Sequence, residues 1–139
     1  MKPFYHEFEQ TSDLGIEVSG LSLENLFENA VYSLFDLMVD GKNISDKSHR
    51  KIELKADNRE LLLRELLSEL LYLFQTKYFI VSRINITDLD DKFLTAEIYG
   101  EIPESEKYSI KREIKAITYH QLNISQTKTG YVARFVMDI

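Results

Sequence analysis

Hydrophobic residues recur every three or four positions in two stretches of this chain and at alternate positions in most of the others. The first helical stretch covers residues 23–38, with Ser22 before it as an N-cap residue. The second, DNRELLLRELLSELLYLFQT, covers residues 57–76, and Asp57 and Glu60 in it have the spacing of a capping box. Its leucines cover a wide face, which is typical of a helix packed on a sheet.

Alternation of apolar and polar residues predicts strands near the start of the chain, at residues 52–56 and throughout the second half. The later candidates are FIVSRINIT, FLTAEIYG, IKAITYHQLNIS and YVARFVMDI, which cover residues 79–87, 93–100, 114–125 and 131–139. Turns at DLDDK and TKTG would form two hairpins, with Gly130 left-handed in the second. A long charged loop follows Gly100. The pattern predicts an α+β fold, with two amphipathic helices packed on a mostly antiparallel β-sheet in one domain, residues 1–139.

Charge and composition narrow the class of protein. The 139 residues carry a net charge of −6, so the chain is a poor stand-alone binder of RNA or DNA, which require a surplus of cations. The absence of cysteine excludes disulfides, thiolate metal sites and a cysteine nucleophile. The first residues lack the apolar h-region expected of a signal peptide, and no apolar run approaches the roughly 20 residues that span a bilayer. We expect a cytoplasmic protein that does not enter a membrane.

Most familiar catalytic and metal-binding motifs are missing. The acidic cluster DLDD fails the EF-hand template, because Phe93 stands where glycine is needed, and indicates a solvated turn. The three histidines have unrelated spacings, and no nucleotide-binding motif is present. His120 falls on the predicted strand 114–125 and is interpreted as a structural residue. Lys115, on the same strand, is a candidate contact residue.

Two carboxylates lie at opposite ends of the chain, Asp13 in a turn-like segment and Asp138 in the last strand. Each has an ordinary interpretation, a turn residue for Asp13 and a frayed terminus for Asp138. If the last strand runs beside the start of the chain, both would converge with the end of Ile139 and repel each other unless a cation lay between them. An all-oxygen set of ligands suits Ca²⁺, Mg²⁺ or Mn²⁺ better than zinc.

Five ordered segments of the chain resemble the signatures of the archease family. They are QTSDLGIEV, LFDLMVD, LLSELLYLF, IKAITYHQL and the terminal ARFVMDI. The resemblance implies a small α+β protein that assists an RtcB-type RNA ligase in tRNA splicing and RNA repair. That ligase uses GTP and Mn²⁺, and archeases promote its guanylylation and its multiple turnover.

The resemblance also assigns roles to particular residues. It implies one divalent metal ion, with Ca²⁺ expected and Mn²⁺ or Mg²⁺ as alternatives, between Asp13, Asp138 and a terminal or backbone oxygen of Ile139. Lys115 matches the functional lysine of the family's KAxTYH motif. Gln10 replaces the histidine that opens the first signature, and both Gln10 and His120 are candidates for a second shell around the metal.

Three functions follow as hypotheses. The first is a non-catalytic activator that contacts the ligase and reaches RNA only through it. The second is a metal-dependent hydrolase built on the same carboxylates, although no general base is evident beyond His120. The third is a chaperone-like modulator of another RNA-modifying enzyme, such as a tRNA methyltransferase. Stimulation of the ligase, turnover of a phosphate ester and capture of the methyltransferase would distinguish them.

Overall fold

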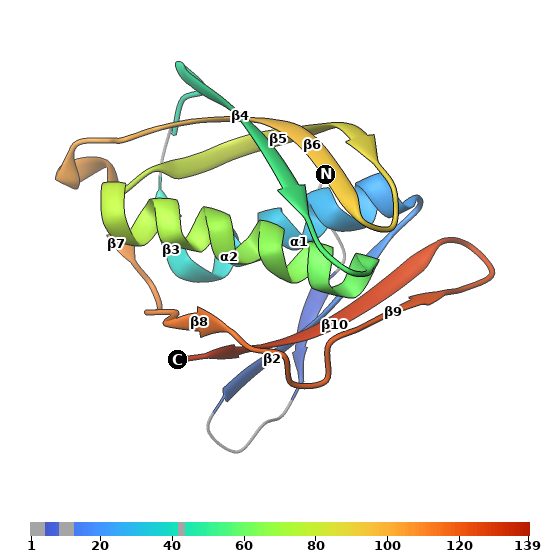
Figure 1. Cartoon of the computed structure of the whole chain (residues 1–139). Coiled ribbons are helices and arrows are strands. Elements are labelled where there is room, and N and C mark those ends of the chain that lie inside the picture. Colours follow the sequence, from blue (N-terminus) through green and yellow to red (C-terminus); the bar gives the residue numbers. More distant parts are fainter. Residues whose placement is uncertain (1–4, 9–12, 42–43) are drawn as a thin grey trace.

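A computed structural model of the chain describes residues 5–8, 13–41 and 44–139, which form two α-helices and ten strands (Figure 1). The helices are α1 (Leu23–Met38) and α2 (Arg59–Lys77). The strands are β1 (Tyr5–Phe8), β2 (Asp13–Gly20), β3 (Val39–Gly41), β4 (Ser48–Lys55), β5 (Ile80–Leu89), β6 (Phe93–Glu101), β7 (Tyr108–Ile110), β8 (Ala116–Ile117), β9 (Asn123–Gln126) and β10 (Tyr131–Asp138). None of the helices in this described part is long and apolar enough to cross a membrane.

The strands form three antiparallel sheets. The largest has the order β1-β2-β10-β8, and β9 pairs with β10 along the same edge as β8. A second sheet has the order β4-β6-β5, and β3 pairs with β7 in a third. Figure 1 shows both helices lying between the two larger sheets. The predicted α+β class is therefore confirmed. A sheet covers the helices on each of two sides, whereas a single sheet was expected.

The sandwiched position of the helices follows from their apolar faces. Eight residues of each helix are buried, and those of α2 are Leu62, Leu63, Leu66, Leu67, Leu70, Leu71, Leu73 and Phe74. Burying each large apolar side chain contributes about 1.5–3 kcal/mol, so contact with two sheets is favoured over contact with one. The wide leucine face predicted for the second helix is explained by this arrangement.

The helix starts agree with the sequence in one case and differ in the other. Ser22 caps α1 as predicted, because its Oγ accepts a hydrogen bond from the backbone N–H of Asn25 at 3.0 Å. The prediction that Asp57 caps α2 is wrong. Asn58 is the N-cap, and its Oδ1 accepts from the N–H of Leu61 at 2.9 Å. Both residue types are good caps, so the local pattern could not separate them.

Both predicted hairpins are present. Asp90 closes the β5–β6 turn, since its carboxylate accepts from the N–H groups of Lys92 and Phe93 at 2.8 Å each. In the β9–β10 turn the expected left-handed Gly130 is wrong, because no described glycine has a positive φ. Glycine is needed there for space, since a Cβ would lie 2.2 Å from the carbonyl oxygen of Gly20.

The segment after Gly100 differs most from its prediction. Residues 108–110 of the expected loop form β7, which pairs with β3. Residues 114–125 are not one continuous strand, because the chain turns between β8 and β9 and Gln121 adopts a left-handed conformation with φ 53°. The alternation of residue types in this segment did not indicate the turn.

Candidate functional site

The end of the β2–β10 pair brings two carboxylates together. Asp13 and Asp138 are direct register partners in the antiparallel ladder. Directly opposed residues of such a ladder project to the same face, with Cβ atoms about 4.5–5.5 Å apart. Leu14 and Met137, the next pair inward, are buried in the core, so the two aspartates belong to the opposite, outer face of the sheet.

Both aspartate side chains are at least partly accessible to solvent, and neither forms an ion pair with a described residue. Asp13 is half-buried and Asp138 is exposed. Within the described residues of the outer face, Arg134 lies 3.3 Å from the Glu17 carboxylate, and the His6 ring lies 3.5 Å from the same carboxylate. No ion pair in this part of the chain includes Asp13 or Asp138.

Lys115 and Ile139 lie beside this pair along the backbone. The N–H of Lys115 donates to the carbonyl oxygen of Asp138 at 2.7 Å, and the following residue, Ala116, is the register partner of Asp138. Lys115 is exposed, and Ile139 directly follows the strand with 41% of its surface accessible. Asp13, Asp138, Ile139 and the backbone of Lys115 therefore share one end of the largest sheet.

Helix α2 fixes the backbone around Lys115. The side-chain amide of Gln75 donates to the carbonyl oxygens of Ile114 and Lys115, both at 3.2 Å. Further along, Nε of Arg64 donates to the carbonyl oxygen of Ile117 at 3.0 Å. Arg64 is one of the polar residues opposite the leucine face of α2, and the sequence pattern contains no signal that such a residue would hold a strand by a carbonyl group.

The two remaining candidates have different outcomes. His120 is exposed in the turn after β8, not on a strand, and its backbone N–H donates to Oγ1 of Thr118 at 3.1 Å. The placement of His120 on an alternating strand was wrong, because the chain reverses at Gln121. Gln10 lies outside the described residues.

The oxygen atoms at this end fit a hard divalent cation. The carboxylates of Asp13 and Asp138 lie on one face, and Ile139 follows Asp138 with its main-chain oxygens. Oxygen atoms of both kinds are ligands that Ca²⁺, Mg²⁺ and Mn²⁺ prefer. Among the described residues, no group of three or more His, Asp or Glu side chains is arranged to hold a metal. A metal ion here would therefore depend on two aspartates, with main-chain oxygens or water for the remaining positions.

Burial and hydrogen bonds shift the pKa values of Glu101, Glu28 and Tyr5. Glu101 is 1% exposed, and Nζ of Lys107 at 2.8 Å and the N–H of Ser45 at 2.6 Å lower its pKa to about 2. Burial raises the pKa of Glu28. Burial and a hydrogen bond to Asp36 raise the pKa of Tyr5. Each of these groups is hydrogen-bonded to another part of the chain, and none of them belongs to the aspartate pair.

Two of the hollows on the described surface can be compared with the candidate residues. The larger, about 350 Å³, lies between α1 and β5, and Glu28, Tyr32 and Asp36 are among its lining residues. It contains none of the residues singled out from the sequence. The smaller, about 290 Å³, lies at the end of α2, where Tyr78 and Ile114 contribute to its wall. Of these two, the smaller adjoins the segment that carries Lys115.

Comparison with known proteins gives one consistent result. The sequence profile of the Archease protein family matches residues 5–139. The chain is 34% identical to Protein archease of Methanosarcina barkeri, over 97% of this chain and 95% of that protein. It is 36% identical to Protein archease of Pyrococcus furiosus, over 97% of this chain and 98% of that one.

Solved structures share the same fold. The solution structure of Methanobacterium thermoautotrophicum protein 1598 superposes with a TM-score of 0.83 at 30% identity, covering 100% of both chains. A Thermotoga maritima crystal structure, described as an archease and possible chaperone, superposes with a TM-score of 0.64 at 22% identity, covering 95% of this chain and 94% of the other.

Proposed function

The chain belongs to the archease family, and we propose that it is a non-catalytic protein cofactor of an RtcB-type RNA ligase. In this role it promotes guanylylation of the ligase and restores it for further turnovers, in the tRNA splicing and RNA repair of the cytoplasm. The observation that carries the proposal is the pairing of Asp13 with Asp138 beside the backbone of Lys115. These are the residues that match the family's functional positions.

The proposed metal site uses the outer face of the sheet. Asp13 and Asp138 would hold one divalent ion through their carboxylates, with an oxygen of Ile139 as a further ligand, and Ca²⁺ is the expected ion. When bound, such an ion would neutralise the negative charge of the two opposed carboxylates. The residues of this chain would then hold the two strand ends that carry these ligands in register.

Lys115 is the proposed contact to the ligase active site. Its ammonium group is a compact point charge on a flexible stem, suited to a phosphate of GTP or of the RNA backbone. Gln75 and the carbonyl of Asp138 fix its backbone while its side chain stays exposed. The net charge of −6 favours a protein partner that holds the RNA itself.

Multiple-turnover ligation tests the proposal directly. The cognate RtcB-type ligase is assayed at limiting concentration with GTP and Mn²⁺, with and without this protein, on RNA ends that carry a 3′-phosphate and a 5′-hydroxyl. Continued turnover only in the presence of the protein is expected. Unchanged turnover with both proteins folded would overturn the proposal.

The other two hypotheses have their own readouts in parallel assays. Metal-dependent hydrolysis of a phosphate ester by the isolated protein would favour the hydrolase. Stimulation of a tRNA methyltransferase, without any effect on the ligase, would favour the chaperone-like modulator.

A further inference from the structure

An exposed aromatic ring is fixed in place close to the proposed contact residue. Tyr119 is 65% exposed, and its ring lies over the guanidinium group of Arg64 with 3.8 Å between Cζ and the ring centroid. The Arg64 side chain is only 19% exposed. The helix side of the ring is therefore covered by a partly buried cation, and much of the remaining ring surface faces solvent.

Both the ring and its backbone are held by further contacts. Nε of Arg64 donates to the carbonyl oxygen of Ile117 at 3.0 Å, and its NH1 lies 3.8 Å from the Glu65 carboxylate. The backbone N–H and the hydroxyl of Thr118 both donate to the carbonyl oxygen of Val136 at 2.9 Å. A side chain ordered in advance loses little conformational entropy when it binds, and this favours affinity.

The ring and Lys115 occupy one tethered segment of chain. Gln75 holds the carbonyl groups of Ile114 and Lys115, and Arg64 holds that of Ile117, so α2 fixes the segment at both ends. The position of Tyr119 relative to Lys115 is set by these bonds and by the pairing of β8 with β10. A partner that contacts Lys115 would meet Tyr119 on the same rigid segment.

Charge favours a protein over a nucleic acid as the partner at this ring. Exposed aromatic rings can stack on bases, but nucleic-acid sites surround such rings with free cations. Here the charge of Arg64 is shared with Glu65, and the whole chain carries −6. Tyrosine and arginine, together with tryptophan, are enriched at the energetic centres of protein interfaces.

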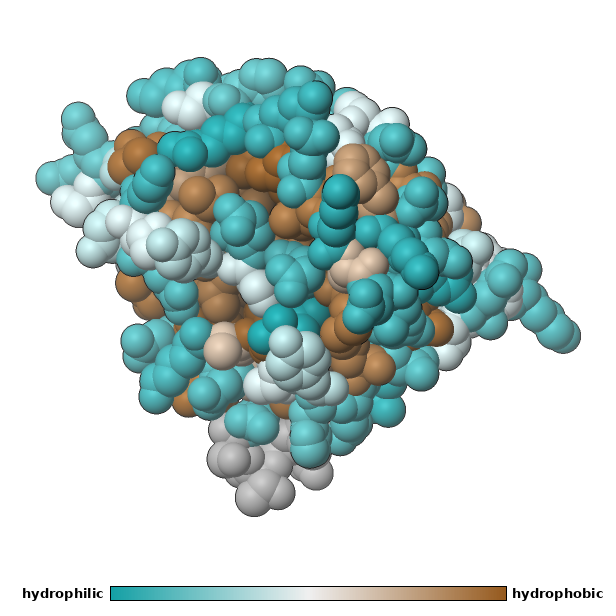
Figure 2. Space-filling model, viewed as in Figure 1, coloured by the Kyte–Doolittle hydropathy of each residue, from teal (hydrophilic) through white to brown (hydrophobic). Residues whose placement is uncertain are grey.

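The surface around the helices favours binding through single anchoring side chains such as Tyr119. On the face shown in Figure 2, brown hydrophobic areas are divided by teal hydrophilic side chains. Binding to a surface of this kind depends on a few anchoring side chains rather than on one broad apolar patch.

We infer that Tyr119, stacked on Arg64, anchors this protein to a surface of the RtcB-type ligase next to the site that Lys115 contacts. The inference rests on the proposed function and extends it to a docking residue. The Tyr119 ring contributes affinity, whereas Lys115 acts at the ligase active site. Removal of the ring therefore weakens binding without changing the effect of the bound protein.

Titration of the ligase with the intact protein tests this inference. Binding is measured by calorimetry, and ligation is followed against activator concentration, for the wild type, Tyr119→Ala and Tyr119→Phe. Tyr32→Ala is the matched control, since it removes a tyrosine that lies on α1 and is 41% exposed. Circular dichroism and thermal melting establish that each variant is folded.

We expect Tyr119→Ala to raise the Kd and the half-saturating concentration about tenfold or more, with the same ligation rate at saturation. Tyr119→Phe and Tyr32→Ala should stay within about twofold of the wild type. An unchanged Kd for Tyr119→Ala, beside a wild type that stimulates the ligase, overturns the inference alone. The inference is also overturned if Tyr119→Ala loses binding to a labelled single-stranded RNA while its affinity for the ligase is unchanged. Absence of any binding or stimulation by the wild type overturns the proposed function and the inference together.

Discussion

Asp13 and Asp138 face each other across two strands from opposite ends of the chain, and no described cation pairs with either carboxylate. Like charges directly opposed on a sheet destabilise the pairing of its strands. This arrangement opposes the stability of the central strand pair unless a positive charge lies between the two side chains. The same geometry that repels in isolation attracts a divalent cation.

Replacement of one aspartate should therefore change stability in opposite directions with and without metal. In EDTA, we expect Asp138→Asn to leave the free energy of unfolding unchanged or to raise it by about 0.2–1 kcal/mol, because repulsion is relieved. With Ca²⁺ or Mn²⁺ at about 100 times its Kd, the wild type should gain about 2.7 kcal/mol and the variant much less. Urea denaturation in both buffers measures the difference. Asp88→Asn, an exposed carboxylate on β5, is the control, and an equal metal-dependent gain in both variants would contradict the site.

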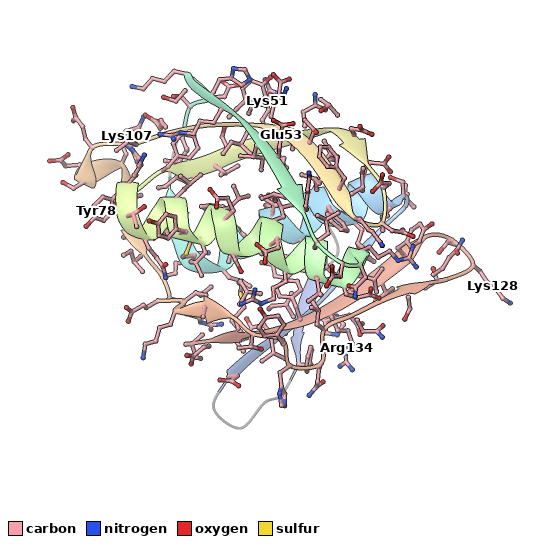
Figure 3. All side chains as sticks on the ribbon, viewed as in Figure 1. Lys51, Glu53, Tyr78, Lys107, Lys128 and Arg134 are labelled. Carbon is pink, nitrogen blue, oxygen red and sulfur yellow. The ribbon has the colours of Figure 1, made fainter. Side chains whose placement is uncertain are left out.

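Removal of the Lys115 charge should abolish the effect on the ligase without affecting the fold. Lys115 is exposed, so Lys115→Ala is expected to shift stability by no more than about 0.5 kcal/mol. Stimulation of multiple-turnover ligation should fall to the level of the ligase alone. Lys128→Ala serves as the control, because Lys128 extends from the β9–β10 turn at the other end of β10 (Figure 3). Full stimulation by Lys115→Ala would remove this residue from the mechanism.

A methyl group at Gly100 should destabilise the three-stranded sheet. A Cβ there would lie 2.0 Å from the carbonyl oxygen of Ile80, and a backbone atom cannot move aside cheaply. We expect Gly100→Ala to lower the free energy of unfolding by about 2 kcal/mol or more. In Gly41→Ala the nearest atom is a side-chain carbon of Ile44 at 3.0 Å, which can rotate, so a smaller loss is expected. Equal losses in the two variants would mean that the close approach at Gly100 is relieved by backbone movement.

The Glu101 carboxylate should make stability depend on pH in the acid range. Its pKa is about 2 in the folded protein, against an ordinary value of 4.5, because Lys107 and the N–H of Ser45 bond to the ionised form. The stabilisation is complete above about pH 4.5 and is lost as the pH falls toward 2. We expect Glu101→Gln to melt several degrees lower at neutral pH and to show a shallower decline across that window.

Thermal melting between pH 2 and 7 records the comparison. Glu104→Gln, at an exposed position in the loop that follows β6, is the control and should follow the wild-type curve. Parallel curves for wild type and Glu101→Gln would show that the carboxylate has no special role in acid stability.

The sequence predicted the local elements well where hydrophobic periodicity was long. Residues 23–38 and most of 57–76 are helical, since four or more turns of apolar spacing leave few alternatives. Shorter signals were less specific. The chain turns within residues 114–125, where Gln121 adopts a left-handed conformation. Glutamine is not a residue type that indicates such a turn, so the alternation was interpreted as one strand.

The arrangement of the candidate site could not be obtained from local pattern. The pairing of Asp13 with Asp138 depends on which strands become neighbours, and the resemblance to a family suggested this where periodicity could not. The contacts of Gln75 and Arg64 with the carbonyl groups of residues 114–117 were missed for a related reason. A polar stripe on a helix has the same pattern whether it faces water or an exposed backbone.

The position of β10 inside the largest sheet affects how the protein is made. β2 emerges early from the ribosome, but its partner, residues 131–138, is synthesised more than a hundred residues later. At typical rates of translation, this delay is on the order of ten seconds. During that time β2 has only β1 as a strand partner, and the edge that β10 later covers is exposed to chaperones. A ribosome that stalls before residue 131 therefore holds a chain that cannot close this sheet, even when both helices have been synthesised.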